Sequence, residues 1–255
     1  MSASLDIGLR EPLCRYLLAW GDDELILAQR DAEWTGHAPI LEEDIAFANI
    51  AQDELGHAIL WYEMAAELGA GRPDESAYGR PAAAFRNVQL VELPRDDWAF
   101  SMLRQYLWDA YERCFGELAG HSAYRPLQEA WLKVRPEESY HYRHTSGWLL
   151  RLGQGTEEGR RRSQAALDAL WPLTGQLFSD DLERRQLAAA GLVPQPAALR
   201  TDWLALVEPH LAGCGLVLPL AAAGLPPGRE AHTPHLAALV ADLQAVAQLD
   251  PAAEW

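Results

Sequence analysis

The chain has 255 residues, 49% of them hydrophobic, and its 37 acidic and 21 basic side chains give a formal net charge of −16. A chain of this length can bury a sizeable core, and its negative charge argues against nucleic acid or an anionic membrane surface as a partner. The three cysteines form no metal-binding or redox spacing, and the sequence shows neither a signal peptide nor a transmembrane run. We therefore expect a cytoplasmic protein.

Apolar residues recur every three or four positions along four long segments, which predicts four long helices, at residues 12–34, 41–68, 96–119 and 126–152. Pro12 is expected in the first turn of the first helix, and Pro136 is expected to kink or restart the fourth. Residues 74–94 show no helical period and form a long crossover, although 87–93 could be a short strand. Shorter helices are expected at 157–178, 181–190, 196–211 and 233–249.

Two helical hairpins joined by a long crossover predict an all-α fold, a ferritin-like four-helix bundle with additional C-terminal helices. We expect residues 1–178 to form the bundle core. Residues 179–255 are expected to form a helical extension that packs on the bundle or on a partner. The last residue, Trp255, carries a large aromatic ring that favours docking of the C-terminus over fraying.

The second predicted helix carries a carboxylate and an imidazole three residues apart, Glu54 and His57, where the apolar stripe otherwise places core residues. The fourth predicted helix repeats this arrangement with Glu138 and His141. Residues three apart lie on one helix face, and an unpaired buried carboxylate is costly. One such pair usually lies on a solvated face, but the repetition indicates a shared inward-facing site.

Each pair has an upstream carboxylate on the stripe of the preceding helix. Glu24 precedes Glu54 by 30 residues and Asp109 precedes Glu138 by 29, which places each at similar depth in its hairpin. Glu112 competes with Asp109, which we prefer on spacing. Carboxylate and imidazole ligands suit two iron or manganese ions, so the predicted ligands are Glu24, Glu54, His57, Asp109, Glu138 and His141. Such a set can also persist without metal, as a buried hydrogen-bonded network.

Other polar motifs have simpler explanations. His232 and His235 could ligate a metal, but they lie at a predicted helix start and are expected to cap it and dock the tail. The run Arg160–Arg162 is typical of a solvated face, although it could also meet the phosphates of a large anionic substrate.

Several stretches are specific enough to indicate a family: Trp20–Asp23, Gln29–Pro39, Leu41–Ala46, Gly147–Thr156, His232–Leu236 and Trp255. In these the chain resembles PaaC-type members of the PaaA/PaaC family, subunits of bacterial phenylacetyl-CoA 1,2-epoxidase. The resemblance implies a ferritin-like subunit of a multicomponent monooxygenase in phenylacetate catabolism, whose PaaA-type subunit is the di-iron catalyst. PaaC-type chains are regarded as having lost their metal ligands, whereas here all six positions hold ligand-capable side chains.

Three functions are compatible with these observations. The resemblance favours a structural or auxiliary subunit that pairs with a catalytic PaaA-type chain and other epoxidase subunits in a homo- or hetero-oligomer. The alternative is that this chain is itself a di-metal carboxylate oxidase or oxygenase that uses the retained ligands. A stand-alone iron-storage protein would fit the paired motif, but it fits neither the C-terminal extension nor the resemblance.

Overall fold

The computed structural model describes residues 5–220 and 228–250, and most of them are helical. These two ranges contain ten α-helices, two 3₁₀ segments and no β-strand. The predicted all-α class is confirmed, and the helices are consistent with a ferritin-like bundle. Within the same ranges no helix has the length and apolar character needed to cross a bilayer. Trp255, for which docking is predicted, lies outside the described residues.

The chain separates into two compact units, each with one of the predicted hairpins. The α1–α2 unit comprises Asp6–Pro94 and Arg229–Trp255, and its longest helices are α1 (Ile7–Ala32) and α2 (Leu41–Glu67). The α5–α6 unit comprises Met1–Leu5 and Arg95–Gly228, with α5 (Trp98–Ala119) and α6 (Arg125–Gly155) as its longest helices. The boundary expected at residue 178, between the bundle core and the C-terminal extension, stays a prediction.

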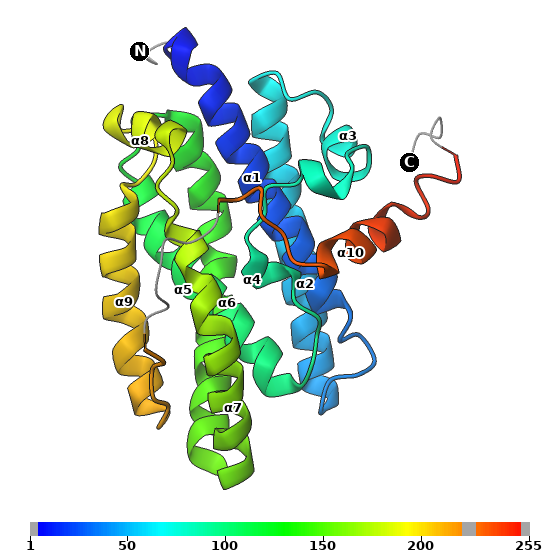
Figure 1. The fold of residues 1–255 in the computed structure, drawn as a ribbon, viewed down its shortest axis with the longest axis vertical. Coiled ribbons are helices and arrows are strands. Elements are labelled where there is room, and N and C mark those ends of the chain that lie inside the picture. Colours follow the sequence, from blue (N-terminus) through cyan, green and yellow to red (C-terminus); the bar gives the residue numbers. More distant parts are fainter. Residues whose placement is uncertain (1–4, 221–227, 251–255) are drawn as a thin grey trace. The chain divides into compact units, whose positions relative to one another are not determined.

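α1 and α2 run side by side as an antiparallel hairpin (Figure 1). Near the start of α1, the Cys14 thiol lies 3.5 Å from the carbonyl oxygen of Ala65 near the end of α2. Further along, the rings of Trp20 and Trp61 have centroids 5.7 Å apart. Both rings are almost completely buried, so apolar burial along this seam is the main force that joins the two helices.

Gly21 allows the two helices to approach closely next to Trp20. A Cβ atom at this position would lie 2.6 Å from the ring of Tyr62, which is too close for a real contact. Tyr62 occupies that space and its hydroxyl donates a hydrogen bond of 2.7 Å to Asp22 Oδ1. The glycine of the Trp20–Asp23 motif is therefore needed for helix packing.

Two buried aspartates of the same motif hold the crossover against α1. The crossover consists of α3 (Pro73–Tyr78), a 3₁₀ turn η1 (Ala82–Ala84) and α4 (Gln89–Glu92). Asp22 Oδ2 accepts a hydrogen bond of 2.7 Å from the Arg86 N–H, and Asp23 Oδ1 accepts one of 2.7 Å from the Val88 N–H. These bonds satisfy crossover donors that would otherwise be buried without acceptors.

Hydrogen bonds hold the C-terminal segment to the same unit, both before α10 (His235–Gln244) and at its last residue. His232 Nδ1 lies 2.6 Å from Glu92 Oε1, and the N–H of Thr233 donates a bond of 2.6 Å to Glu92 Oε2. Gln244 Nε2 donates to the Arg80 carbonyl at 2.7 Å. The interactions of His232 agree with the predicted docking role of this motif.

Asp23 is the source of a testable pH dependence. Burial raises its pKa to about 6, against the opposing attraction of Arg229, whose Nη1 lies 2.6 Å from Asp23 Oδ2. A raised pKa means that the folded state binds the proton of Asp23 more tightly than the unfolded state does. Protonation of Asp23 therefore stabilises the fold fully below about pH 4, and this contribution is lost as the pH rises through 6. Between pH 4 and pH 7 we expect the stability of Asp23→Asn to improve relative to wild type by up to about 3 kcal/mol. Urea unfolding at several pH values measures this difference, and a constant difference would contradict it.

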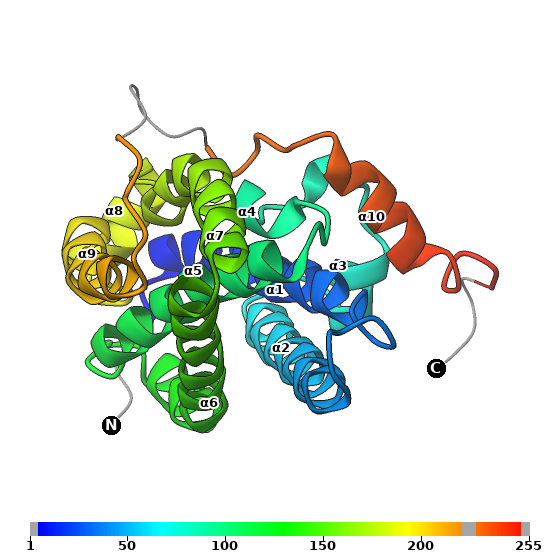
Figure 2. The ribbon, with the colours of Figure 1, turned by 90° about the horizontal axis from the view of Figure 1, so that it is seen from below.

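α5 is the central helix of its unit and packs against α6, α7 (Glu157–Leu170) and α9 (Pro196–Gly213) (Figure 2). Its side chains are buried around nearly the whole circumference, as expected of an interior helix. The pairing with α6 is antiparallel. Trp98 and Trp148 form an edge contact with centroids 5.6 Å apart, and Tyr106 stacks on Tyr142 at 5.7 Å.

The remaining helical segments of this unit are shorter. The predicted helix 157–178 ends as an α-helix at Leu170 and continues as a 3₁₀ segment, η2 (Trp171–Phe178), with Pro172 in its first turn. α8 (Leu182–Ala189) follows, and its buried Arg184 donates to the carbonyls of Leu177 and Ser179 at 2.9 and 3.1 Å. The guanidinium thereby satisfies carbonyls at the end of η2.

Three local predictions are wrong in whole or in part. α1 begins at Ile7 rather than at Pro12, because Asp6 caps it by accepting a bond of 2.8 Å from the Gly8 N–H. At Pro136 a kink or a restart is expected; the restart is wrong, because α6 continues through this proline, and the kink stays a prediction. Pro136 is exposed, so water can hydrate the carbonyl that it leaves without a donor. The possible strand at 87–93 is instead the single turn of α4.

Candidate metal centre

The first half-site lies in the α1–α2 hairpin. Glu24 comes from α1, and Glu54 and His57 come from adjacent turns of α2. Their candidate ligand atoms all lie within 4.8 Å of one another. The His57 Nδ1 is 3.5 Å from Glu54 Oε2, and all three side chains are buried. The structure therefore brings together the three ligands that the sequence predicts for this hairpin.

The second half-site lies in the α5–α6 hairpin. Asp109 and Glu112 come from α5 and Glu138 from α6, and one carboxylate oxygen of each lies within 4.8 Å of the others. His141 Nδ1 is 3.4 Å from Glu138 Oε1, and these four side chains are buried as well. The predicted ligands of this hairpin are thus close together, and Glu112 joins them.

The two half-sites have nearly the same internal geometry. In each one a glutamate and a histidine three residues apart lie on one helix face, and Nδ1 of the histidine is 3.5 or 3.4 Å from an oxygen of the glutamate. The helix imposes this, since i and i+3 lie on adjacent turns of one face. In each one the preceding helix of the hairpin supplies a further carboxylate.

Each carboxylate oxygen of Asp109 accepts a hydrogen bond from a different neighbour. Gln105 Nε2 donates to Asp109 Oδ1 at 2.9 Å, and the Thr145 hydroxyl donates to Asp109 Oδ2 at 2.6 Å. Such bonds fix the orientation of a carboxylate, whether it ligates a metal directly or supports a ligand. The structure leaves Asp109 and Glu112 as the two candidates for the carboxylate that α5 supplies. Gln105 and Thr145 were not predicted as site residues, and their only signal is a polar side chain on an apolar stripe.

The donor set fits a transition-metal centre. Each half-site combines carboxylate oxygens with one imidazole, the mixture that suits iron and manganese. Burying several carboxylates and imidazoles together is costly without a cation or a proton to compensate their charge. Bound iron would supply redox chemistry with dioxygen, and Glu24, Glu54, His57, Glu138 and His141, with Asp109 or Glu112, would hold it.

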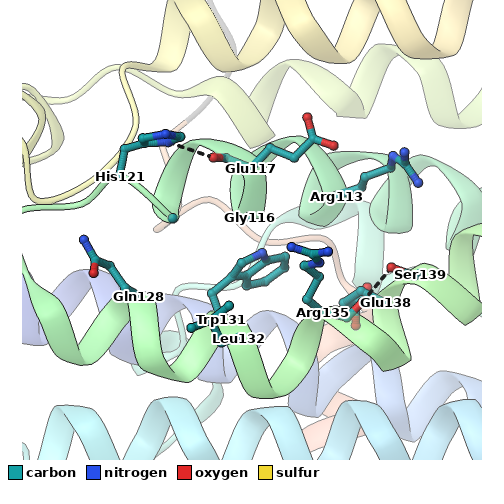
Figure 3. A pocket seen from close by; sticks show the side chains of 11 residues that line it. Arg113, Gly116, Glu117, His121, Gln128, Trp131, Leu132, Arg135, Glu138 and Ser139 are labelled. Atoms are coloured by element: carbon teal, nitrogen blue, oxygen red, sulfur yellow. Dashed lines mark hydrogen bonds between the residues drawn. The ribbon is translucent and has the colours of Figure 1, made fainter.

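A cavity of about 550 Å³ lies between α5 and α6 and reaches Glu138 (Figure 3). Trp131 and Arg135 project from α6 into the space that faces α5, and Arg113 is one of the lining residues that α5 contributes (Figure 3). Glu138 is therefore the one predicted ligand that also lines this cavity. Two guanidinium groups, of Arg113 and Arg135, and two carboxylates, of Glu117 and Glu138, line the cavity, so its charged groups are balanced.

The chain is therefore an all-α protein whose paired long helices bury carboxylate and imidazole side chains, as in ferritin-like bundles. The model of a family described as "Phenylacetic acid catabolic protein" matches residues 4–255. The chain belongs to this family. It is 37% identical to the C subunit of 1,2-phenylacetyl-CoA epoxidase from Escherichia coli (strain K12) over 245 residues, which are 95% of this chain and 99% of that protein. It is 26% identical to the A subunit of the same epoxidase over 165 residues, or 64% of this chain and 52% of that protein.

Proposed function

We propose that this chain is the PaaC-type component of a multicomponent phenylacetyl-CoA epoxidase of the cytoplasm. It pairs with a catalytic PaaA-type chain and supports it. The observation that carries this proposal is the match to the C subunit of the Escherichia coli epoxidase over almost the full length of both chains. Sequence similarity to the A subunit as well means that the two partners share a common helical plan.

Co-expression of the chain with a PaaA-type homologue from the same source tests this proposal. We expect the two to purify together in a fixed ratio. With phenylacetyl-CoA, dioxygen and an electron-donating reductase, we expect epoxide to form only when the PaaA-type chain is present. A chain that elutes alone and changes neither the solubility nor the turnover of the PaaA-type homologue would contradict a role in the complex.

A second candidate function is metal-dependent oxidase or oxygenase chemistry by this chain itself. The retention of both half-sites favours it, since Glu54 with His57 and Glu138 with His141 have matching geometry. We propose the six ligands predicted from the sequence, with Glu112 as the competitor of Asp109, as a centre for two iron or manganese ions. Dioxygen consumption by the iron-loaded chain without a PaaA-type partner would support this function.

A further inference from the structure

The outward side of α2 carries an exposed apolar stripe. Its four large side chains, which we call the outer stripe, are Leu41, Ile45, Leu55 and Ile59, with exposed fractions of 72%, 56%, 40% and 49%. Leu41 and Leu55 are 14 residues apart, as are Ile45 and Ile59. Fourteen residues are two heptads, so the four side chains share one face, as in the seam of a coiled coil. Ala48 and the exposed Gln52 lie on this face between the two apolar pairs.

The outer stripe is not the side of α2 that packs in its own hairpin. The inward side carries Phe47, Ile50, Trp61 and the two predicted ligands, all of which are buried. α2 therefore has two apolar faces, whereas a surface helix normally has one apolar face and a charged face opposite. An exposed apolar stripe of this length on a soluble helix indicates contact with another macromolecule.

Acidic residues flank the outer stripe at both ends. Glu42 and Asp44 lie within one turn of Leu41 and Ile45, and Glu63 lies one turn beyond Ile59. No arginine or lysine occurs anywhere in α2. Glu63 and Glu67 lie near the C-terminal end of the helix, where the helix dipole disfavours negative charge. Arg10 of α1 donates to the carbonyl oxygens of Glu67 and Leu68 at this end, at 3.1 Å each. A cationic group of a partner beside Glu63 would add to this compensation.

This charge pattern argues against a second copy of the chain as the occupant. In a parallel pair of α2 helices like ends meet, and in an antiparallel pair Glu42 and Asp44 meet Glu63 of the other copy. Both arrangements bring acids together, which is destabilising. A helix with an apolar seam and flanking arginines or lysines is complementary in both respects.

We propose that the outer stripe of α2 is the docking surface for an amphipathic helix of the PaaA-type partner, with basic residues beside its apolar seam. This inference rests on the proposed function, because it assigns a place and a chemistry to the partner contact. A heptad seam with charged flanks sets partner choice in helical assemblies, and the acidic flanks here select a basic partner.

Binding measurements between the full-length chain and its PaaA-type homologue test this surface. We expect Ile45→Glu/Leu55→Glu to weaken the affinity by at least tenfold, since it places charge in the apolar seam. The matched control is Leu132→Glu, which alters a leucine of α6 that is 66% exposed, and it should leave the affinity unchanged. Glu63→Arg should also weaken binding without touching the apolar seam, and the wild-type affinity should fall as salt is raised.

The possible outcomes separate the two proposals. If the double variant binds as tightly as wild type, the docking surface is wrong and the proposal of a PaaC-type role stands. If wild type does not bind the PaaA-type chain, both are overturned. If wild type sediments as a homodimer that Ile45→Glu/Leu55→Glu converts to a monomer, self-association replaces the proposed partner. A circular dichroism spectrum unchanged from wild type shows that a variant remains folded.

Discussion

His57→Ala and His141→Ala are each expected to abolish binding of the metal pair while leaving the helices intact. Each histidine is the imidazole donor of its half-site, 3.5 or 3.4 Å from its glutamate, and removing one ligand typically weakens a metal site severely. Wild type purified with iron supplied should contain close to two metal ions per chain. Elemental analysis of untagged protein measures the content, and far-ultraviolet circular dichroism reports the fold.

His144→Ala is the matched control for this prediction. His144 follows His141 by three residues on α6, but it belongs to neither half-site and its ring stacks on Tyr140 with centroids 5.8 Å apart, so metal content should not change. Unchanged metal in both His57→Ala and His141→Ala would remove the metal-binding function. Wild type without metal would mark both half-sites as inherited polar networks, and it would leave the proposed role in the epoxidase complex untouched.

The same measurement separates the two carboxylates of α5. Glu112→Gln should lower the metal content if Glu112 is the ligand, and Asp109→Asn should lower it if Asp109 is. Because Thr145 and Gln105 both donate to Asp109, we expect Thr145→Val to weaken metal affinity only if Asp109 acts at the metal. Removing a hydrogen bond that orients a metal ligand typically weakens the affinity on the order of 10- to 100-fold.

Gly116→Ala is expected to destabilise the α5–α6 hairpin by about 3 kcal/mol. A Cβ atom at Gly116 would lie 1.5 Å from Trp131 Cε2. The indole borders the cavity between α5 and α6, but moving it would break its edge contact with Phe115, whose centroid is 5.7 Å away, and expose a buried ring. Urea unfolding without added metal measures the change in the free energy of unfolding.

Gly147→Ala is the control, since it makes the same substitution within α6, where a Cβ atom would meet nothing within 4 Å. Alanine has the higher helix propensity, so this variant should be more stable than wild type by about 0.5–1 kcal/mol. Equal effects of the two substitutions would show that close packing against Trp131 does not limit stability. The two results together separate steric overlap from intrinsic helix propensity.

Most helices and the two glutamate–histidine pairs are predictable from the amino-acid sequence, because both depend on short-range geometry. A period of three to four residues specifies α2 from Leu41 almost to its observed end. The same period places Glu54 next to His57, and Glu138 next to His141, without reference to any other part of the chain. The two glutamate–histidine pairs were therefore predictable before any tertiary contact was known.

The roles of the neighbouring polar residues, in contrast, depend on contacts between segments that are distant in the sequence. Asp22 and Asp23 directly precede Glu24 in the sequence. Their carboxylates nevertheless accept hydrogen bonds from backbone N–H groups more than 60 positions away, at Arg86 and Val88. The Thr145 bond to Asp109 likewise joins two helices. Such contacts depend on how the helices and the crossover pack, and no local period in the sequence encodes them.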